Sequence, residues 1–218
     1  MTLLGRLLRN RRAGDTHMAW NLPNLRVQPP SSPGDPSDVE DSPPTSREGL
    51  PDSPSREQLI LSSRHFGDGD AIALEHCAKN IGGDDTSPHL AWTPPPPGTA
   101  QLLLVMEDID VPLPKPAVHC VALLDPASGQ LAPGALDARR ATAGVHLLRS
   151  TIGRGYHGPA PIKGHGPHRY VFQLFALAAP VADPLGTTPL DRARPRALLP
   201  AISAPVLARA RLTGVHER

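Results

Sequence analysis

Three long apolar runs dominate the pattern of the chain: residues 101–106 (QLLLVM), 118–124 (VHCVALL) and 170–177 (YVFQLFAL). Runs of this length without polar alternation are typical of strands buried on both faces. Shorter extended patterns are found at 59–62, 72–77, 87–92 and 211–215. Gly- and Pro-rich turns separate them, including four consecutive prolines at 94–97 that cannot enter a sheet interior. The pattern predicts a mainly β fold, a sandwich with few helices.

One helix is predicted near the C-terminus. Its apolar positions keep helical spacing: Leu198, Leu199, Ile202, Val206, Leu207 and Ala210. Pro200 and Pro205 fall inside this pattern, so the helix is expected to be kinked or to start only at Pro205.

Residues 1–57 predict an N-terminal extension to a domain at 58–218. Leu3, Leu4, Leu7 and Leu8 share one helical face, with arginines elsewhere. We favour the interpretation that this short helix is frayed and docks on its own domain or on nothing. The alternative is an amphipathic anchor for an anionic membrane or a partner groove. Residues 21–57 hold nine prolines and few apolar side chains, so we expect them to be disordered and without a core.

Composition narrows the function classes. The formal net charge of +1 provides no electrostatic footprint for nucleic acid. No apolar stretch approaches the ~18 residues of a transmembrane helix, and the start lacks the pattern of a secretory signal, so a cytoplasmic protein is expected. Cys77 and Cys120 show no metal or redox spacing and are expected to be buried free thiols, with a disulfide as the alternative.

The candidate chemistry lies at strand ends. Asp108 and Asp110 follow the first apolar run, His119 opens the second, and His168 and Tyr170 open the third, after a Gly- and Pro-rich loop. Two imidazoles, a phenol and loop N–H groups can form an anion cradle, with a carboxylate stabilising one imidazole. Each residue alone has a structural interpretation: a core histidine, an Arg169–carboxylate pair, or aspartates that cap a turn.

Taken together, these motifs resemble the phosphatidylethanolamine-binding protein family, which includes the Raf kinase inhibitor proteins, and its bacterial branch most closely. The resemblance covers about residues 59–216. It rests on Asp108-x-Asp110-x-Pro112, on His119 in its strand, on Ser87-Pro88-x-Leu90-x-Trp92, and above all on the segment 155–177, GYHGPAPIKGHGPHRYVFQLFAL.

The resemblance implies an antiparallel β-sandwich with a small surface pocket for phosphate-like or carboxylate anions. Carried over residue by residue, the pocket is expected to comprise Asp108, Asp110, Pro112, His119, Pro161, His168 and Tyr170, with the two prolines as wall. Four positions depart from the family pattern and are expected to alter selectivity: Ile109, Ala117, Ala160 and Ile162.

The resulting prediction is a binding protein that holds a small anion or a phospholipid headgroup. The alternative is an interaction protein that inhibits a kinase or a serine protease through the pocket rim. We do not expect an enzyme, because the chain has no nucleophile elbow, no phosphate-binding Gly-Lys loop and no HExxH-type spacing. No cofactor and no metal are expected.

Overall fold

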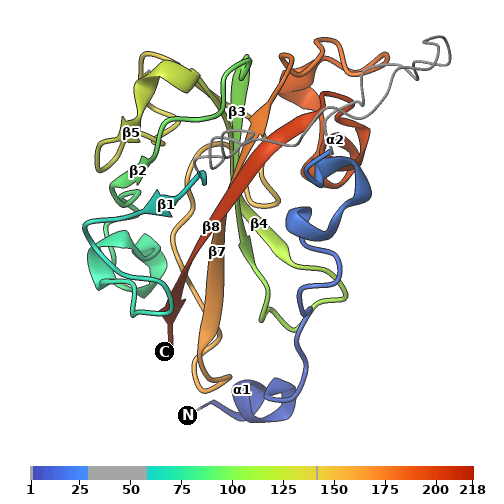
Figure 1. Cartoon of the computed structure of the whole chain (residues 1–218). Coiled ribbons are helices and arrows are strands. Elements are labelled where there is room, and N and C mark those ends of the chain that lie inside the picture. Colours follow the sequence, from blue (N-terminus) through green and yellow to red (C-terminus); the bar gives the residue numbers. More distant parts are fainter. Residues whose placement is uncertain (1, 29–57, 141) are drawn as a thin grey trace, which may run out of the picture.

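The computed structural model describes residues 2–28, 58–140 and 142–218 (Figure 1). The predicted disorder of residues 29–57 lies outside these residues. An antiparallel five-stranded sheet forms the centre, in the order β6-β4-β3-β7-β8, beside a small antiparallel sheet in the order β1-β2-β5. The predicted mainly β fold with a few helices is confirmed.

The strands are β1 (Leu61–Ser62), β2 (Leu90–Trp92), β3 (Gln101–Asp108), β4 (Ala117–Leu124), β5 (Gln130–Leu131), β6 (Val145–Leu147), β7 (His168–Leu177) and β8 (Val206–His216). The α-helices are α1 (Leu3–Leu8) and α2 (Pro195–Ala201). Short 3₁₀ turns are η1 (Ala19–Asn21), η2 (Pro23–Leu25), η3 (Leu74–His76), η4 (Lys79–Ile81), η5 (Pro126–Ser128) and η6 (Leu190–Arg192).

The large sheet is covered on both faces, which explains the unbroken apolar runs. Along β3, Leu102 and Leu104 point into a core shared with the small sheet. Leu103 and Val105 point the other way, into a second core closed by α2. Successive side chains of a strand face opposite sides, so a central strand between two cores needs apolar side chains on both faces, as at residues 102–106.

The predicted C-terminal helix and the extended piece at 211–215 are present, but the helical prediction for residues 202–210 was wrong. The α2 helix ends at Ala201, and Val206–His216 forms β8, which pairs with β7 along its whole length. Pairing with β7 satisfies the backbone of an otherwise open sheet edge, and this outweighs the helical spacing of the apolar residues. The predicted extended piece at 72–77 instead contains the turn η3.

Residues 19–25 of the N-terminal extension pack on the second core. Leu25 is fully buried, Asn24 Nδ2 donates to the carbonyls of Leu199 and Ile202, and Arg209 stacks 4.0 Å over the Trp20 ring. The prediction that residues 21–28 belong to a segment without a core was therefore wrong. In Figure 1 the blue segment runs from α1 along one side of the sheet to α2.

Other expectations concern membranes and thiols. No helix in the described ranges is both long enough and apolar enough to cross a bilayer. Cys77 and Cys120 are buried free thiols, as predicted. Burial raises the pKa of Cys77 to about 11 and that of Cys120 to about 12, so both are inert at neutral pH.

Candidate functional site

Strand register brings four predicted side chains together at one end of the large sheet. Asp108, the last residue of β3, lies opposite Tyr170 of β7, and His168 precedes Tyr170 by two residues on the same face. The rings of His168 and Tyr170 lie 6.4 Å apart, and those of His119 and Tyr170 lie 5.3 Å apart, edge to face.

A β-bulge aims His119 at this site. Cys120 pairs with Met106 but Val118 pairs with Glu107, which leaves His119 as the extra residue of β4. Simple alternation from Cys120, which faces the first core, would turn His119 to the opposite face of the sheet. A bulge reorients the side chain it carries, so His119 meets Tyr170 instead.

Asp108 organises the site through both carboxylate oxygens. Oδ1 accepts from the backbone N–H of Asp110 at 2.9 Å, which closes the turn after β3, and Oδ2 lies 2.8 Å from Nδ1 of His168. Asp108 therefore both caps the turn and orients the imidazole of His168, two roles that the sequence left open.

His165 extends this pair into a chain of hydrogen bonds. Its Nε2 donates to the carbonyls of Leu8 and Arg11 at 2.8 and 3.1 Å. Its Nδ1 lies 2.6 Å from Nε2 of His168, so one proton is shared between the two rings. A further proton is shared between His168 Nδ1 and Asp108.

His119 is held as a neutral ring with a defined tautomer. Burial lowers its pKa below the usual 6.5, despite the opposing effect of Asp108. Nδ1 donates to the carbonyl of His157 at 2.8 Å, which places the lone pair on Nε2. At neutral pH His119 therefore offers the site a hydrogen-bond acceptor.

Tyr170 is the unsatisfied member of the site. Its side chain is completely buried, and no hydrogen bond reaches its hydroxyl. Burial raises the pKa of Tyr170, as do the charge of Asp108 and the approach of its carboxyl group, against a smaller effect of the Ala160 backbone N–H. Neither Asp108 nor the Ala160 N–H reaches hydrogen-bond geometry with the hydroxyl. The phenol therefore remains protonated and holds an unused donor; a buried polar atom of this kind calls for a ligand or water.

The site is nearly enclosed. Asp108, His119, His168 and Tyr170 are 4, 6, 2 and 0% exposed. These polar side chains are thus almost fully buried, with His119 the most accessible, and a surface pocket above them stays a prediction.

Asp110 does not join the four. Its carboxylate binds Arg169 through two hydrogen bonds of 2.8 Å and Arg12 at 3.0 Å. Asp110 therefore holds the turn and the N-terminal segment rather than facing a ligand, and the predicted Arg169–carboxylate pair is present. Pro112 and Pro161 lie in the loops that follow β3 and precede β7, and their role as wall residues stays a prediction.

The departures from the family pattern have distinct surroundings. Ile109 is buried in a small apolar cluster with Met18 and Val171, so it receives the N-terminal segment. The side chain of Ala160 is exposed, and Ala117 and Ile162 are half-buried. The expected effect of these positions on selectivity stays a prediction.

Sequence reasoning missed two histidines at the site. His165 binds His168 directly, and His157 exchanges backbone and side-chain hydrogen bonds with His119. Nε2 of His157 is buried without a partner. The only available signal was their position in the same Gly- and Pro-rich loop. In the ranges that the structure describes, no three His, Cys, Asp or Glu side chains are arranged to hold a metal ion.

Comparisons with known proteins agree with this architecture. The profile of the family described as "Phosphatidylethanolamine-binding protein" matches residues 62–217. The chain is 34% identical over 166 residues to "Putative lipoprotein LppC" of Mycobacterium tuberculosis, covering 75% of each chain. It is 35% identical over 124 residues to the UPF0098 protein YbhB of Escherichia coli, covering 55% of this chain and 78% of that one.

A solved structure supports the same assignment. The crystal structure of E. coli YbcL, described as a new member of the mammalian PEBP family, superposes with a TM-score of 0.63 at 26% identity. The match covers 74% of this chain and 99% of YbcL. By sequence profile and by fold, this chain belongs to the phosphatidylethanolamine-binding protein family.

Proposed function

We propose that the chain binds a small oxyanion, phosphate or the phosphate group of a lipid headgroup, between His119 and Tyr170. The observation that carries this proposal is the fully buried Tyr170 hydroxyl without a hydrogen-bond partner. Leaving such a group unpaired costs about 1–3 kcal/mol, and an anionic oxygen would satisfy it.

The two neighbouring polar atoms define what the ligand must offer. Tyr170 can only donate to it, because burial keeps the phenol protonated. Neutral His119 can only accept from it, through Nε2. A phosphate that retains one O–H offers an acceptor oxygen to Tyr170 and a donor to His119. In a phosphodiester headgroup, an ethanolamine ammonium could donate to His119 instead.

Asp108 and His168 support binding rather than proton transfer in this proposal. His168 has both nitrogens engaged, by Asp108 and by His165, so it fixes the wall of the site. We accordingly propose a binding protein and not an enzyme; inhibition of a kinase or protease stays a prediction.

Titration calorimetry with phosphate and with phosphoethanolamine tests the proposal, and the chain offers a matched pair of tyrosines. Tyr170→Phe should weaken phosphate binding about tenfold or more, since a hydrogen bond to a charged group is lost. The same change should leave the free protein as stable or more stable by about 1 kcal/mol, since the hydroxyl removed had no partner.

Tyr156→Phe is the control. Its hydroxyl donates to the carbonyl of His76 at 2.8 Å, so this variant should lose about 1 kcal/mol of stability and keep phosphate affinity. Wild-type protein that takes up neither compound, or a Tyr170→Phe variant with unchanged affinity, would refute the proposal.

A further inference from the structure

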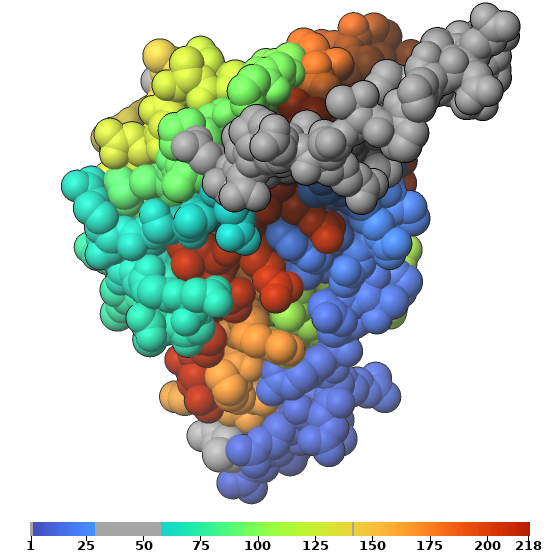
Figure 2. Space-filling model, viewed as in Figure 1, coloured from blue at the N-terminus to red at the C-terminus, as the bar shows by residue number. Residues whose placement is uncertain are grey.

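Helix α1 displays its leucines instead of burying them. Leu3, Leu4 and Leu7 are 86, 55 and 78% exposed. In Figure 2 the blue N-terminal segment forms the lower end of the molecule. Single exposed leucines are ordinary, but three on one short helix form an apolar patch that marks an interaction surface.

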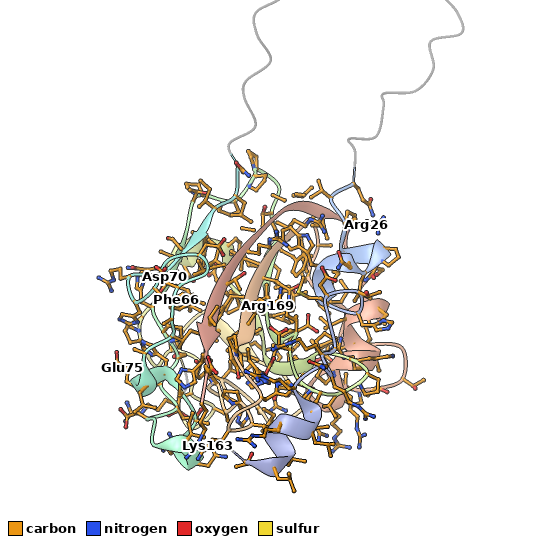
Figure 3. All side chains as sticks on the ribbon, turned by 90° about the horizontal axis from the view of Figure 1, so that it is seen from below. Arg26, Phe66, Asp70, Glu75, Lys163 and Arg169 are labelled. Carbon is orange, nitrogen blue, oxygen red and sulfur yellow. The ribbon has the colours of Figure 1, made fainter. Side chains whose placement is uncertain are left out.

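The orientation of α1 is fixed by its glycine. Gly5 is buried, and a Cβ there would lie 2.3 Å from the carbonyl oxygen of Lys163. Thr2 Oγ1 donates to the same carbonyl at 2.7 Å and accepts from Gly5 N–H at 3.1 Å. At the other end, Leu8 O accepts from His165. The helix is anchored through its glycine face, which turns the leucines away from the domain (Figure 3, beside Lys163).

Positive charge surrounds the leucines. Arg6, Arg9, Arg11 and Arg12 all precede the first carboxylate of the chain, Asp15. Arg12 pairs with Asp110, whereas Arg9, Arg11 and Lys163 are exposed. Apolar side chains beside arginines complement a surface whose interior is apolar and whose outermost groups are negatively charged.

We propose that α1 docks the chain on an anionic lipid bilayer. Leu3, Leu4 and Leu7 enter the headgroup region, and Arg9 and Arg11 contact lipid phosphates. A second copy of the chain fits this patch less well, since pairing would bring two arginine clusters together. The patch lies outside residues 62–217 that match the family, and its binding does not depend on the oxyanion site.

Co-sedimentation of the full chain with vesicles tests the docking. We expect binding to mixed phosphatidylglycerol–phosphatidylcholine vesicles, weaker binding to phosphatidylcholine alone, and release by high salt. The triple variant Leu3→Gln/Leu4→Gln/Leu7→Gln should lose about tenfold or more in affinity, because its apolar area no longer enters the bilayer. Arg9→Gln/Arg11→Gln should lose about fivefold for each charge.

Matched controls separate this surface from general stickiness and from the site. Ile60→Gln/Leu74→Gln removes side chains that are 53 and 51% exposed elsewhere and should bind vesicles like the wild type. The leucine triple variant should keep the wild-type affinity for soluble phosphate in calorimetry, so failure of the oxyanion proposal is distinguishable.

Absence of binding to the anionic vesicles, or equal binding by the leucine variant with an unchanged melting temperature, overturns the proposal. A leucine-dependent dimer in sedimentation, without vesicle binding, would assign the patch to self-association.

Discussion

His119 and Tyr170 show how individual atoms set the chemistry of the site. The tautomer of His119 is fixed by the His157 carbonyl, and burial keeps its ring neutral. Tyr170 keeps its proton for the same reason, low solvation of the charged form. The pair therefore combines one acceptor with one donor, which favours a ligand that offers the complementary pair.

This arrangement predicts a pH-dependent preference between oxyanions. Sulfate carries no O–H at neutral pH and cannot satisfy Nε2 of His119, so phosphate should bind more tightly. The pKa of His119 lies below its usual 6.5; as pH falls through it, Nε2 gains a proton and becomes a donor. Sulfate affinity measured by calorimetry should therefore rise on acidification below about pH 6.5.

His119→Gln provides the control, since an amide does not titrate in this range. The variant should show a flat sulfate profile. A wild-type affinity for sulfate that is independent of pH, or that falls with acidification, would contradict the assignment of His119 as a neutral acceptor.

The turn after β3 is the element on which site and N-terminal segment converge. Asp108 closes this turn and orients His168, while Asp110 binds Arg169 and Arg12. Ala13 and Gly14 donate to the carbonyls of Val111 and Ile109 at 2.9 and 2.8 Å. The two acids of this motif thus have separate roles: Asp108 orients a side chain of the site, and Asp110 holds the N-terminal segment.

Asp110 should make stability sensitive to acid. Burial alone would raise its pKa, but hydrogen bonds from Arg169 and the charges of both arginines outweigh burial and lower it. A carboxyl group with a lowered folded pKa stabilises above its unfolded pKa of about 3.9 and loses that contribution as pH falls further. Denaturant unfolding should therefore show stability falling below about pH 4.

The slope of that fall should be smaller in Asp110→Asn, which also starts from lower stability at neutral pH because Arg169 and Arg12 lose their partner. Asp84→Asn, a change of an exposed carboxylate, serves as the control. Identical acid slopes in wild type and Asp110→Asn would show that another group governs the transition.

At the scale of the whole molecule, the described N-terminal residues complete the fold. Met18 contacts Ile109 and Val171, and Leu25 joins the second core with α2. The buried Glu107, whose pKa burial raises, accepts from the N–H of Ala19 and from Gln173, and pairs with Arg196. The segment therefore supplies one hydrogen-bond donor to a buried carboxyl group as well as apolar area.

Leu25→Ala should destabilise the whole chain by about 2–5 kcal/mol, because it leaves a cavity in a core shared with the sheet. Val27→Ala, at a side chain 41% exposed, should cost far less. Denaturant unfolding by fluorescence should show one transition shifted to lower denaturant. If Leu25→Ala left that transition unchanged, the segment would not belong to the cooperative unit.

The sequence by itself determined the strands at the centre, the mainly β class, the family and the four residues of the site. Short continuous apolar runs bounded by turn residues favour a strand covered on both faces, and the segment 168–170 (HRY) follows the Gly- and Pro-rich loop that carries the family resemblance. These patterns lie in the local sequence, so they can be recognised without knowing which residues pack against them.

Only the tertiary structure decided the rest. A bulge that the alternation of residues does not reveal orients His119 toward Tyr170. Pairing with the edge of β7 makes β8 a strand despite the helical spacing of its apolar residues. Asp110 binds two arginines rather than facing a ligand. The backbone carbonyl of His157 fixes which nitrogen of His119 holds the proton. Each of these outcomes depends on partners distant in the chain, whose competing hydrogen bonds and packing no local pattern records.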